Sequence, residues 1–159
     1  MLVTLIPLFD ENLKVSAYSL FTQKHNFFLQ PSFLGTGQND GASRVAGLEL
    51  METMGIETLS SADKVFVSIG NISIFSDIAG QCDAPHNRVV LLIDNTIPPI
   101  EMYLNRLTEL KTQGYRLAIR NLPVTSYESS ASILKLMDYI LIDSQKVDIT
   151  KARIYFNKL

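Results

Sequence analysis

Several side chains that can take part in chemistry follow apolar segments of the sequence. Arg120 and Asn121 follow "RLAI", Asp94 ends "VVLLID", and Asp143 ends "YILID". If these segments are parallel strands, their carboxyl ends are where α/β proteins place binding and catalytic groups. Asp94 and Asp143 supply carboxylates, whereas Arg120 supplies a guanidinium that keeps its positive charge in a protein.

Arg120 and Asn121 have two interpretations. In the first, the strand end is an anion or partner site, because arginine forms bidentate contacts with phosphate or carboxylate. In the second, Arg120 is structural and pairs with a nearby acid, such as Asp94 or Asp143, across neighbouring strand ends. We expect the structural ion pair, and both interpretations predict a strand end without catalysis.

The other reactive residue types form no recognisable site. The single Cys82 has no cysteine or histidine cluster around it, so we expect a buried thiol, a reducing cytoplasm and no structural zinc. His25 and His86 each adjoin an asparagine in loop-like sequence, which is typical of solvated histidines. The segment "GTGQNDG" does not follow a strand, so we predict no glycine-rich phosphate loop and no cofactor.

The composition describes one soluble globular domain. The 159 residues are 47% apolar and carry a formal net charge of −2, with the basic residues spread along the chain. No basic patch for nucleic acid is present. The opening "MLVTLIPLF" runs directly into Asp10 and Glu11, so it is predicted to be a first strand and not a membrane span. We therefore expect a cytoplasmic protein without a membrane span that does not bind nucleic acid.

Continuous apolar runs alternate with helical patterns along the chain. The runs cover residues 64–70, 88–94, 116–120 and 139–143, and unbroken runs of this kind are typical of parallel strands buried on both faces. Strands joined by helices form βα units with right-handed crossovers. Two architectures are compatible with them, an open doubly wound sheet and part of a (β/α) barrel, because the chain is too short to close a barrel.

Two amphipathic helices are predicted between these runs. One lies within 96–114, has Pro98 and Pro99 in its first turn, and buries the stripe Ile100, Leu104, Leu107 and Leu110. The other lies within 42–55 and buries the stripe Val45, Leu48, Met51 and Met54. Residues 25–39 show no clear periodicity and are predicted to form a long loop.

The order of these segments resembles that of the EAL domain of cyclic di-GMP signalling. It is most similar to the divergent EAL-like half that precedes HDOD domains in two-part bacterial signalling proteins. The resemblance rests on "IPLFDENLKVSAYSLF", "DGASRVAGLE", "KVFVSIGN", "RVVLLIDNTIPPIEMYLNRLTELKTQGYRLAIRNL" and "DYILIDSQKV", and it keeps register from about Ile6 to Val147. It implies an α/β fold in which about six strands form an incomplete, TIM-like barrel. The whole chain, 1–159, is then a single domain that lacks the last two βα units of the family fold.

An active EAL enzyme is a phosphodiesterase that holds two divalent cations with oxygen ligands at its strand ends. The resemblance places the ligand positions of this family on residues that bind cations poorly. These positions are Ser19, Ser68, Leu92, Arg120, Asn121 and Leu141, while Asp94 lies just beyond one of them and Asp143 is kept. The chain is therefore predicted not to be an enzyme, and Ser19, Ser68, Asp94, Arg120, Asn121 and Asp143 are predicted to line a vestigial pocket.

Three functions follow from this sequence. The expected one is an inactive EAL-like signalling or scaffolding module that acts through a protein partner or a homo-oligomer. The alternative is a sensor that binds cyclic di-GMP or another nucleotide weakly without cleaving it. A third is a receiver-type doubly wound domain with Asp94 as phosphoacceptor. Near the C-terminus, Tyr155 and Phe156 lie in a segment that is predicted to be helical from Ile149 and are expected to form a packing or association surface.

Overall fold

The computed structural model describes residues 2–23, 44–60, 63–123, 126 and 129–143 of the chain. These residues build one six-stranded sheet. Its strands are β1 (Leu2–Phe9), β2 (Val15–Gln23), β3 (Lys64–Ser68), β4 (Val89–Asp94), β5 (Arg116–Arg120) and β6 (Tyr139–Ile140). The predicted runs therefore correspond to β3 to β6, with β6 shorter than expected.

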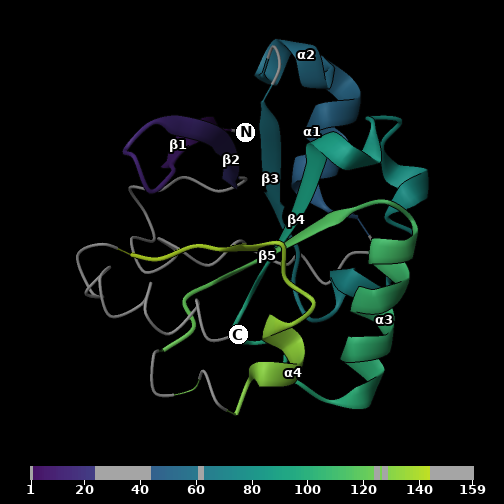
Figure 1. Cartoon of the computed structure of the whole chain (residues 1–159). Coiled ribbons are helices and arrows are strands. Elements are labelled where there is room, and N and C mark those ends of the chain that lie inside the picture. The colour runs from purple at the N-terminus through teal and green to yellow at the C-terminus, as the bar shows by residue number, and fades with distance from the viewer. Residues whose placement is uncertain (1, 24–43, 61–62, 124–125, 127–128, 144–159) are drawn as a thin grey trace.

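The strands lie in the sheet in the same order as in the chain. β1 and β2 form an antiparallel hairpin, and every later strand is parallel to the one before it. A doubly wound sheet reverses its strand order partway across, so the doubly wound and receiver-type alternatives are wrong. The sheet is an incomplete α/β barrel, as predicted (Figure 1).

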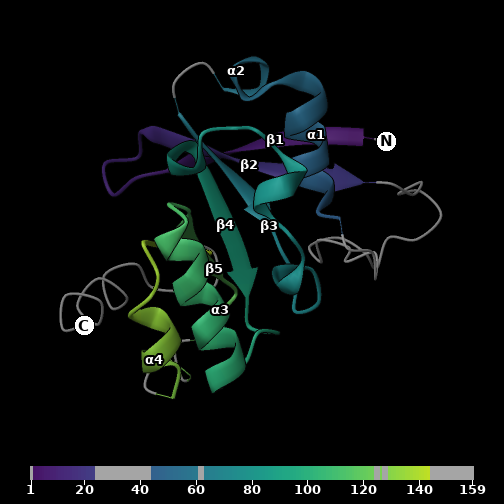
Figure 2. The ribbon, with the colours of Figure 1, turned by 90° about the vertical axis from the view of Figure 1, so that its right-hand side faces the viewer.

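Helices cover one face of this sheet. The longer ones are α1 (Ala46–Met54) and α3 (Glu101–Thr112), and the shorter ones are α2 (Ile56–Leu59) and α4 (Ala131–Leu134). Figure 2 shows α1 and α3 in front of the strands. The connection from β3 to β4 contains three 3-10 turns, η3 (Ser73–Phe75), η4 (Ala79–Gln81) and η5 (His86–Arg88).

The alternation of side chains along each strand divides the core into two parts. On the helix-covered face, the main cluster combines Val67, Leu91 and Ile119 of the strands with Met51 of α1 and Leu107 of α3. On the opposite, concave face, a second cluster contains Ala17, Phe66, Val90, Leu92 and Ala118. Because both faces are buried, the central strands are apolar at consecutive positions, which explains their unbroken runs.

The helix predictions were right in position but partly wrong in detail. α3 begins after Pro98 and Pro99, because Ile100 is extended and forms the N-cap. Ile100 is 51% exposed and Met54 is 44% exposed, so neither belongs to the buried stripe that was predicted for its helix. Gly114, at φ 95, ends α3 in the left-handed conformation that glycine adopts most readily.

Two predictions lie outside the described residues. The long loop of 25–39, with His25, is one of them. The helical segment from Ile149, with Tyr155 and Phe156, is the other.

Candidate functional site

The concave face carries most of the residues that were predicted to line a pocket. Directly opposite residues of neighbouring strands point to the same face of a sheet. Ser19 pairs with Phe66, Ser68 pairs with Leu92, and Asp94 pairs with Arg120. Phe66 and Leu92 belong to the concave cluster, and Asp94 and Arg120 each follow a member of that cluster by two residues. Leu141 packs against the same cluster.

Register separates these residues into three successive rows across the strands. Ser19 shares a row with Phe66, Val90 and Arg116. Ser68 shares the next row with Leu92, Ala118 and Tyr139. Asp94 and Arg120 form the last row, at the carboxyl ends of β4 and β5. At about 3.3 Å per residue, Ser19 lies roughly 13 Å below Asp94 along the strand direction. The structure thus brings Asp94 and Arg120 together, places Ser68 one row away, and leaves Ser19 farther from them.

Arg120 is the unusual member of this group. Its Nε is buried and has no hydrogen-bond partner in the structure. Burial lowers the pKa of the guanidinium, and the charge of Asp94 only partly opposes that effect. Among the described residues, no carboxylate lies within 4 Å of Arg120 in an ion pair. The predicted structural ion pair with Asp94 is therefore present only as a longer-range attraction.

Asp94 is held by its own loop. Its Oδ1 accepts hydrogen bonds from the Thr96 amide at 3.0 Å and the Thr96 hydroxyl at 2.6 Å. These contacts close the turn that follows β4, in the way that an aspartate side chain stabilises an Asx turn. The side chain of Asp94 is therefore held by the turn after β4, although its backbone lies opposite Arg120 of β5.

Asn121 and Asp143 lie at the mouth of the same end of the sheet. Asn121 directly follows β5, is exposed, and adopts φ 57, which is uncommon for a residue with a side chain. Asp143 is exposed and lies three residues beyond the end of β6. The amide of Leu141 donates to the carbonyl of Ile119 at 2.8 Å, so β6 stays attached to β5 as far as this end.

The residues at these strand ends do not fit a pair of divalent cations. Such ions need several anionic or carbonyl oxygens. Leu92, which is 1% exposed, pairs with Ser68 in one row, and the next row carries the positive charge of Arg120. In the part of the chain that the structure describes, no group of three or more histidine, cysteine, aspartate or glutamate side chains is placed to hold a metal ion.

Cys82 and His86 have structural surroundings. Cys82 is 6% exposed, as predicted, and burial raises the pKa of its thiol. His86 was predicted to be a solvated loop histidine; it lies in the β3–β4 connection and is half-buried, and it also makes two contacts. Its ring stacks on Tyr115 at 4.2 Å, and its Nδ1 lies 2.7 Å from the carbonyl of Gln113. The pair forms because η5 crosses the turn that ends α3, so His86 anchors one loop on another.

An exposed apolar surface, which the sequence analysis missed, follows the carboxyl ends of β3 and β4. We call it the α3 patch, and it consists of Ile72, Phe75, Ile100 and Met102, which are 44% to 59% exposed. Phe75 and Tyr103 hold its two segments together, because their ring centroids lie 5.2 Å apart. Arg106 adds two bonds, donating from Nε to Ile74 O and from a terminal nitrogen to Ser76 O, both at 2.8 Å.

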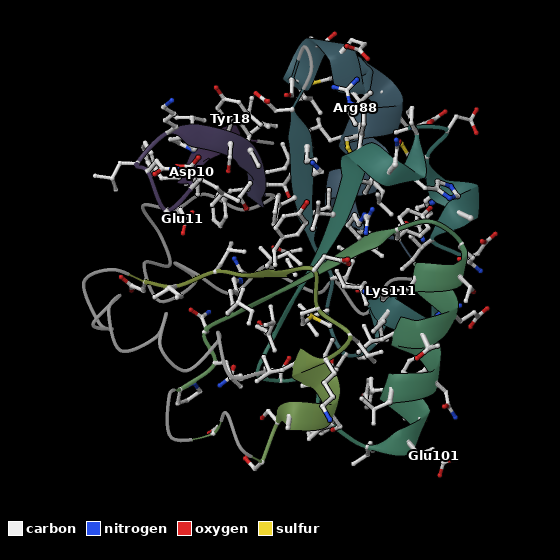
Figure 3. The ribbon with its side chains drawn as sticks, in the orientation of Figure 1. Asp10, Glu11, Tyr18, Arg88, Glu101 and Lys111 are labelled. Carbon is white, nitrogen blue, oxygen red and sulfur yellow. The ribbon has the colours of Figure 1, made fainter. Side chains whose placement is uncertain are left out.

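The exposed charged side chains beside the α3 patch are acidic, whereas Arg106 is only 14% exposed and is paired with Glu109 at 2.7 Å. Residues 70–77 and 98–105 contain two charged side chains, Asp77 and Glu101, and both are exposed acids. Glu101 lies at the N-terminal end of α3, well away from Asp10 and Glu11 on the β1–β2 hairpin (Figure 3). In the sequence, the signal for this surface is weak: two large apolar residues, Ile72 and Phe75, three positions apart in a loop.

The amino ends of β5 and β6 carry a polar cluster that is structural. Asp138 accepts hydrogen bonds from the Leu117 amide at 2.9 Å and from Arg116 at 3.1 Å, and pairs with Lys111 at 3.2 Å. Burial raises the pKa of Asp138, but the hydrogen bonds from Leu117, Arg116 and Lys111 outweigh it, so the pKa lies below its ordinary value. This cluster fastens the end of α3 to the start of β6.

Comparison with known proteins shows the fold type. The structure is similar to EAL enzyme Bd1971 in its cAMP-bound form, with a TM-score of 0.58 and 11% identity over 96% of this chain and 50% of that one. It is also similar to the EAL domain of Mycobacterium smegmatis DcpA, with a TM-score of 0.56 and 18% identity over 89% of this chain and 64% of that one. The fold is thus that of an EAL domain, as predicted, with part of the barrel present.

Sequence comparison adds one curated relative. The "Uncharacterized protein YuxH" of Bacillus subtilis (strain 168) is 26% identical over 146 residues, which are 92% of this chain and 34% of that protein. The chain therefore spans about a third of this relative. No family model matches the sequence. Among the described residues, no helix is long and apolar enough to cross a membrane.

Proposed function

We propose that this chain is a catalytically inactive EAL-like signalling module that acts through contact with a protein partner. The observation that carries the proposal is Arg120, a half-buried arginine with a buried Nε, at the strand end where the resemblance places a metal-binding aspartate. A fixed positive charge there repels the cations that two-metal hydrolysis requires. Leu92, a buried apolar side chain in the adjacent row, removes a second ligand position.

A hydrolysis assay tests the inactive state. The full chain is incubated with cyclic di-GMP and either Mg²⁺ or Mn²⁺, beside an active EAL phosphodiesterase, and the nucleotide is followed by chromatography. We expect intact nucleotide with this chain and linear product with the active enzyme. Turnover that chelator abolishes would refute the proposal. The variant Arg120→Asp is also expected to be inactive, since Ser68 and Leu92 still replace ligands.

The α3 patch supports the protein-contact part of the proposal. Exposed apolar groups that gather on adjacent segments mark interaction surfaces more often than scattered ones do. Because Asp77 and Glu101 flank the patch, a second copy of this chain would bring like charges together. We therefore propose that the occupant is an amphipathic helix of another protein, with apolar residues along one face and lysine or arginine at its margin.

A peptide titration tests this surface. The probe is a synthetic helical peptide of leucine and lysine, and its control replaces every lysine by glutamate. We expect the basic peptide to bind and the acidic one to fail. The double variant Ile72→Ser with Met102→Ser should weaken binding, whereas Leu13→Ser, an equally polar change at an exposed apolar residue on the β1–β2 hairpin, should not. Equal binding by both variants would exclude the α3 patch, and dimerisation in sedimentation experiments would assign it to a second copy.

A second candidate function is a cyclic-nucleotide sensor that does not hydrolyse its ligand. One observation favours it: the similar EAL enzyme Bd1971 has a cAMP-bound form and a form with both cAMP and cyclic-di-GMP bound. Calorimetric titration with each nucleotide tests it, and intact nucleotide with a saturable heat is the supporting result.

We also propose that this chain is related to the EAL-HDOD signalling proteins of bacteria. The length of the Bacillus subtilis relative, of which the chain spans 34%, leaves room there for a further domain.

A further inference from the structure

The carboxyl end of β5 combines a buried donor without a partner with an uncommon backbone conformation. The Nε of Arg120 is buried without an acceptor. A buried donor of a charged group normally finds a partner, because the hydrogen bonds it made to water are otherwise lost. The next residue, Asn121, holds φ 57. Backbone conformations of this kind concentrate at binding sites and turns, where the surroundings maintain them.

The neighbouring acid does not remove the cost at Arg120. Asp94 lies opposite Arg120 in the register, but its Oδ1 is engaged by both donors of Thr96. Burial lowers the pKa of Arg120 more than the charge of Asp94 raises it. The guanidinium is therefore less well solvated in the fold than in water, and its Nε has no acceptor in the structure.

The surroundings of Arg120 indicate which kind of ligand could supply the missing acceptor. Inward from Arg120, the concave face is apolar, with Ala118 and Leu92 both buried. Outward from it, the chain leaves β5 at the exposed Asn121, so the concave face opens toward solvent at this end. The planar guanidinium fork matches the oxygens of a planar or tetrahedral oxyanion. A cation finds too few oxygens at this position, and an apolar ligand leaves Nε unpaired.

We propose that the carboxyl end of β5 is a binding site for a small oxyanion, phosphate or carboxylate, held by the guanidinium of Arg120. The resemblance places a pair of cation-binding aspartates at this position. The site proposed here binds an anion instead. It rests on Arg120 and not on the proposed protein contact. The peptide titration at the α3 patch can therefore fail without affecting it.

The test follows the Arg120 Nε–H signal of the ¹⁵N-labelled full chain by NMR. Three probes are added at constant ionic strength: inorganic phosphate, acetate and cyclic di-GMP, with chloride as the reference anion. We expect a saturable shift of the Nε–H signal with at least one probe. A response to phosphate identifies a phosphate site, a response to cyclic di-GMP alone identifies a phosphodiester, and a response to acetate alone identifies a carboxylate.

Variants distinguish this site from general salt effects. Arg120→Gln is expected to raise the dissociation constant about tenfold or more, since hydrogen bonds between charged partners are the strong ones. Arg120→Lys keeps the charge but loses the fork, so it should bind more weakly than the natural chain and more tightly than Arg120→Gln. Thermal stabilisation by the same anion gives a second readout for these variants. Arg44→Gln, at an arginine whose side chain is 73% exposed, is the matched control and should bind normally.

Two outcomes overturn the inference. One is the absence of a saturable shift with all three probes. The other is a shift or stabilisation that is equal in the natural chain and in Arg120→Gln, because this result assigns the anion to another part of the surface.

Discussion

Replacing Arg120 by methionine is expected to stabilise the ligand-free protein. A buried hydrogen-bonding group without a partner costs about 1 to 3 kcal/mol. Methionine is unbranched, similar in length to the apolar stem of arginine, and adapts well to irregular space. Asp94 keeps both hydrogen bonds from Thr96 in the variant, so little is lost on the other side. Subtracting the long-range attraction to Asp94, we expect a net gain of roughly 1 to 2 kcal/mol in the free energy of unfolding.

Urea denaturation at neutral pH, in a buffer free of phosphate and carboxylates, measures this gain. With a slope of about 2 kcal/mol per molar urea, the midpoint should rise by roughly 0.5 to 1 M. Arg116→Met is the matched control, because Arg116 lies at the other end of the same strand and has a partner, Asp138, at 3.1 Å. The control should be destabilised by about 0.5 kcal/mol, since the Arg116 side chain is 53% exposed.

Opposite signs for the two arginines are the result that supports our reasoning. If Arg120→Met lowers the midpoint as Arg116→Met does, Arg120 makes a net favourable interaction in the absence of ligand. The oxyanion site would then lose its energetic basis, and the structural ion pair with Asp94 would be the correct explanation of this residue.

Three further predictions concern the scaffold around this site. Asp138→Asn should cost about 1 to 2 kcal/mol at pH 7. Because the folded pKa of Asp138 lies below the unfolded one, its stabilisation is present above about pH 4 and is lost as the pH falls; the variant should therefore show a flatter acid limb in denaturation midpoints measured from pH 2 to 7. Gly114→Ala should lower stability by about 1 kcal/mol in the same assay, because φ 95 is unfavourable for alanine, and an unchanged midpoint would contradict this. Burial raises the pKa of Tyr115 to about 12, so its neutral form stabilises the fold below pH 10 and this contribution is lost between pH 10 and 12. Tyr115→Phe should lose less stability over that window, and an identical alkaline limb would show that the hydroxyl is solvated.

Features determined by local pattern were predictable from the sequence. The strands β3 to β5 were found because each is buried on both faces and therefore reads as a continuous apolar run. The end of α3 was found because Gly114 permits the left-handed conformation that terminates it. Family resemblance, rather than periodicity, distinguished an incomplete barrel from a doubly wound sheet, since the order of strands in a sheet leaves little trace in any one segment.

Features determined by contacts between distant segments were not predictable. Ile100 fits the helical stripe by spacing, but it precedes the first turn, and its side chain is half-exposed. The α3 patch depends on the contact between Phe75 and Tyr103, which are separated by a whole strand. Arg120 was expected to form an ion pair because acidic residues lie at the ends of neighbouring strands. Instead, Asp94 accepts hydrogen bonds from Thr96, and this local geometry could not be recognised from the sequence.

The order of the strands has a consequence for how the protein is made. Each strand pairs with the one synthesised immediately before it, from β1 to β6. A chain emerging from the ribosome can therefore add each strand to an edge that has already been synthesised, and no strand has to wait for a partner that comes later in the chain. We expect β1, β2 and β3 to acquire protection from hydrogen exchange on stalled nascent chains before β5 has been synthesised. When β5 is added in this order, Arg120 packs against the edge of β4, where Asp94 already supplies a negative charge.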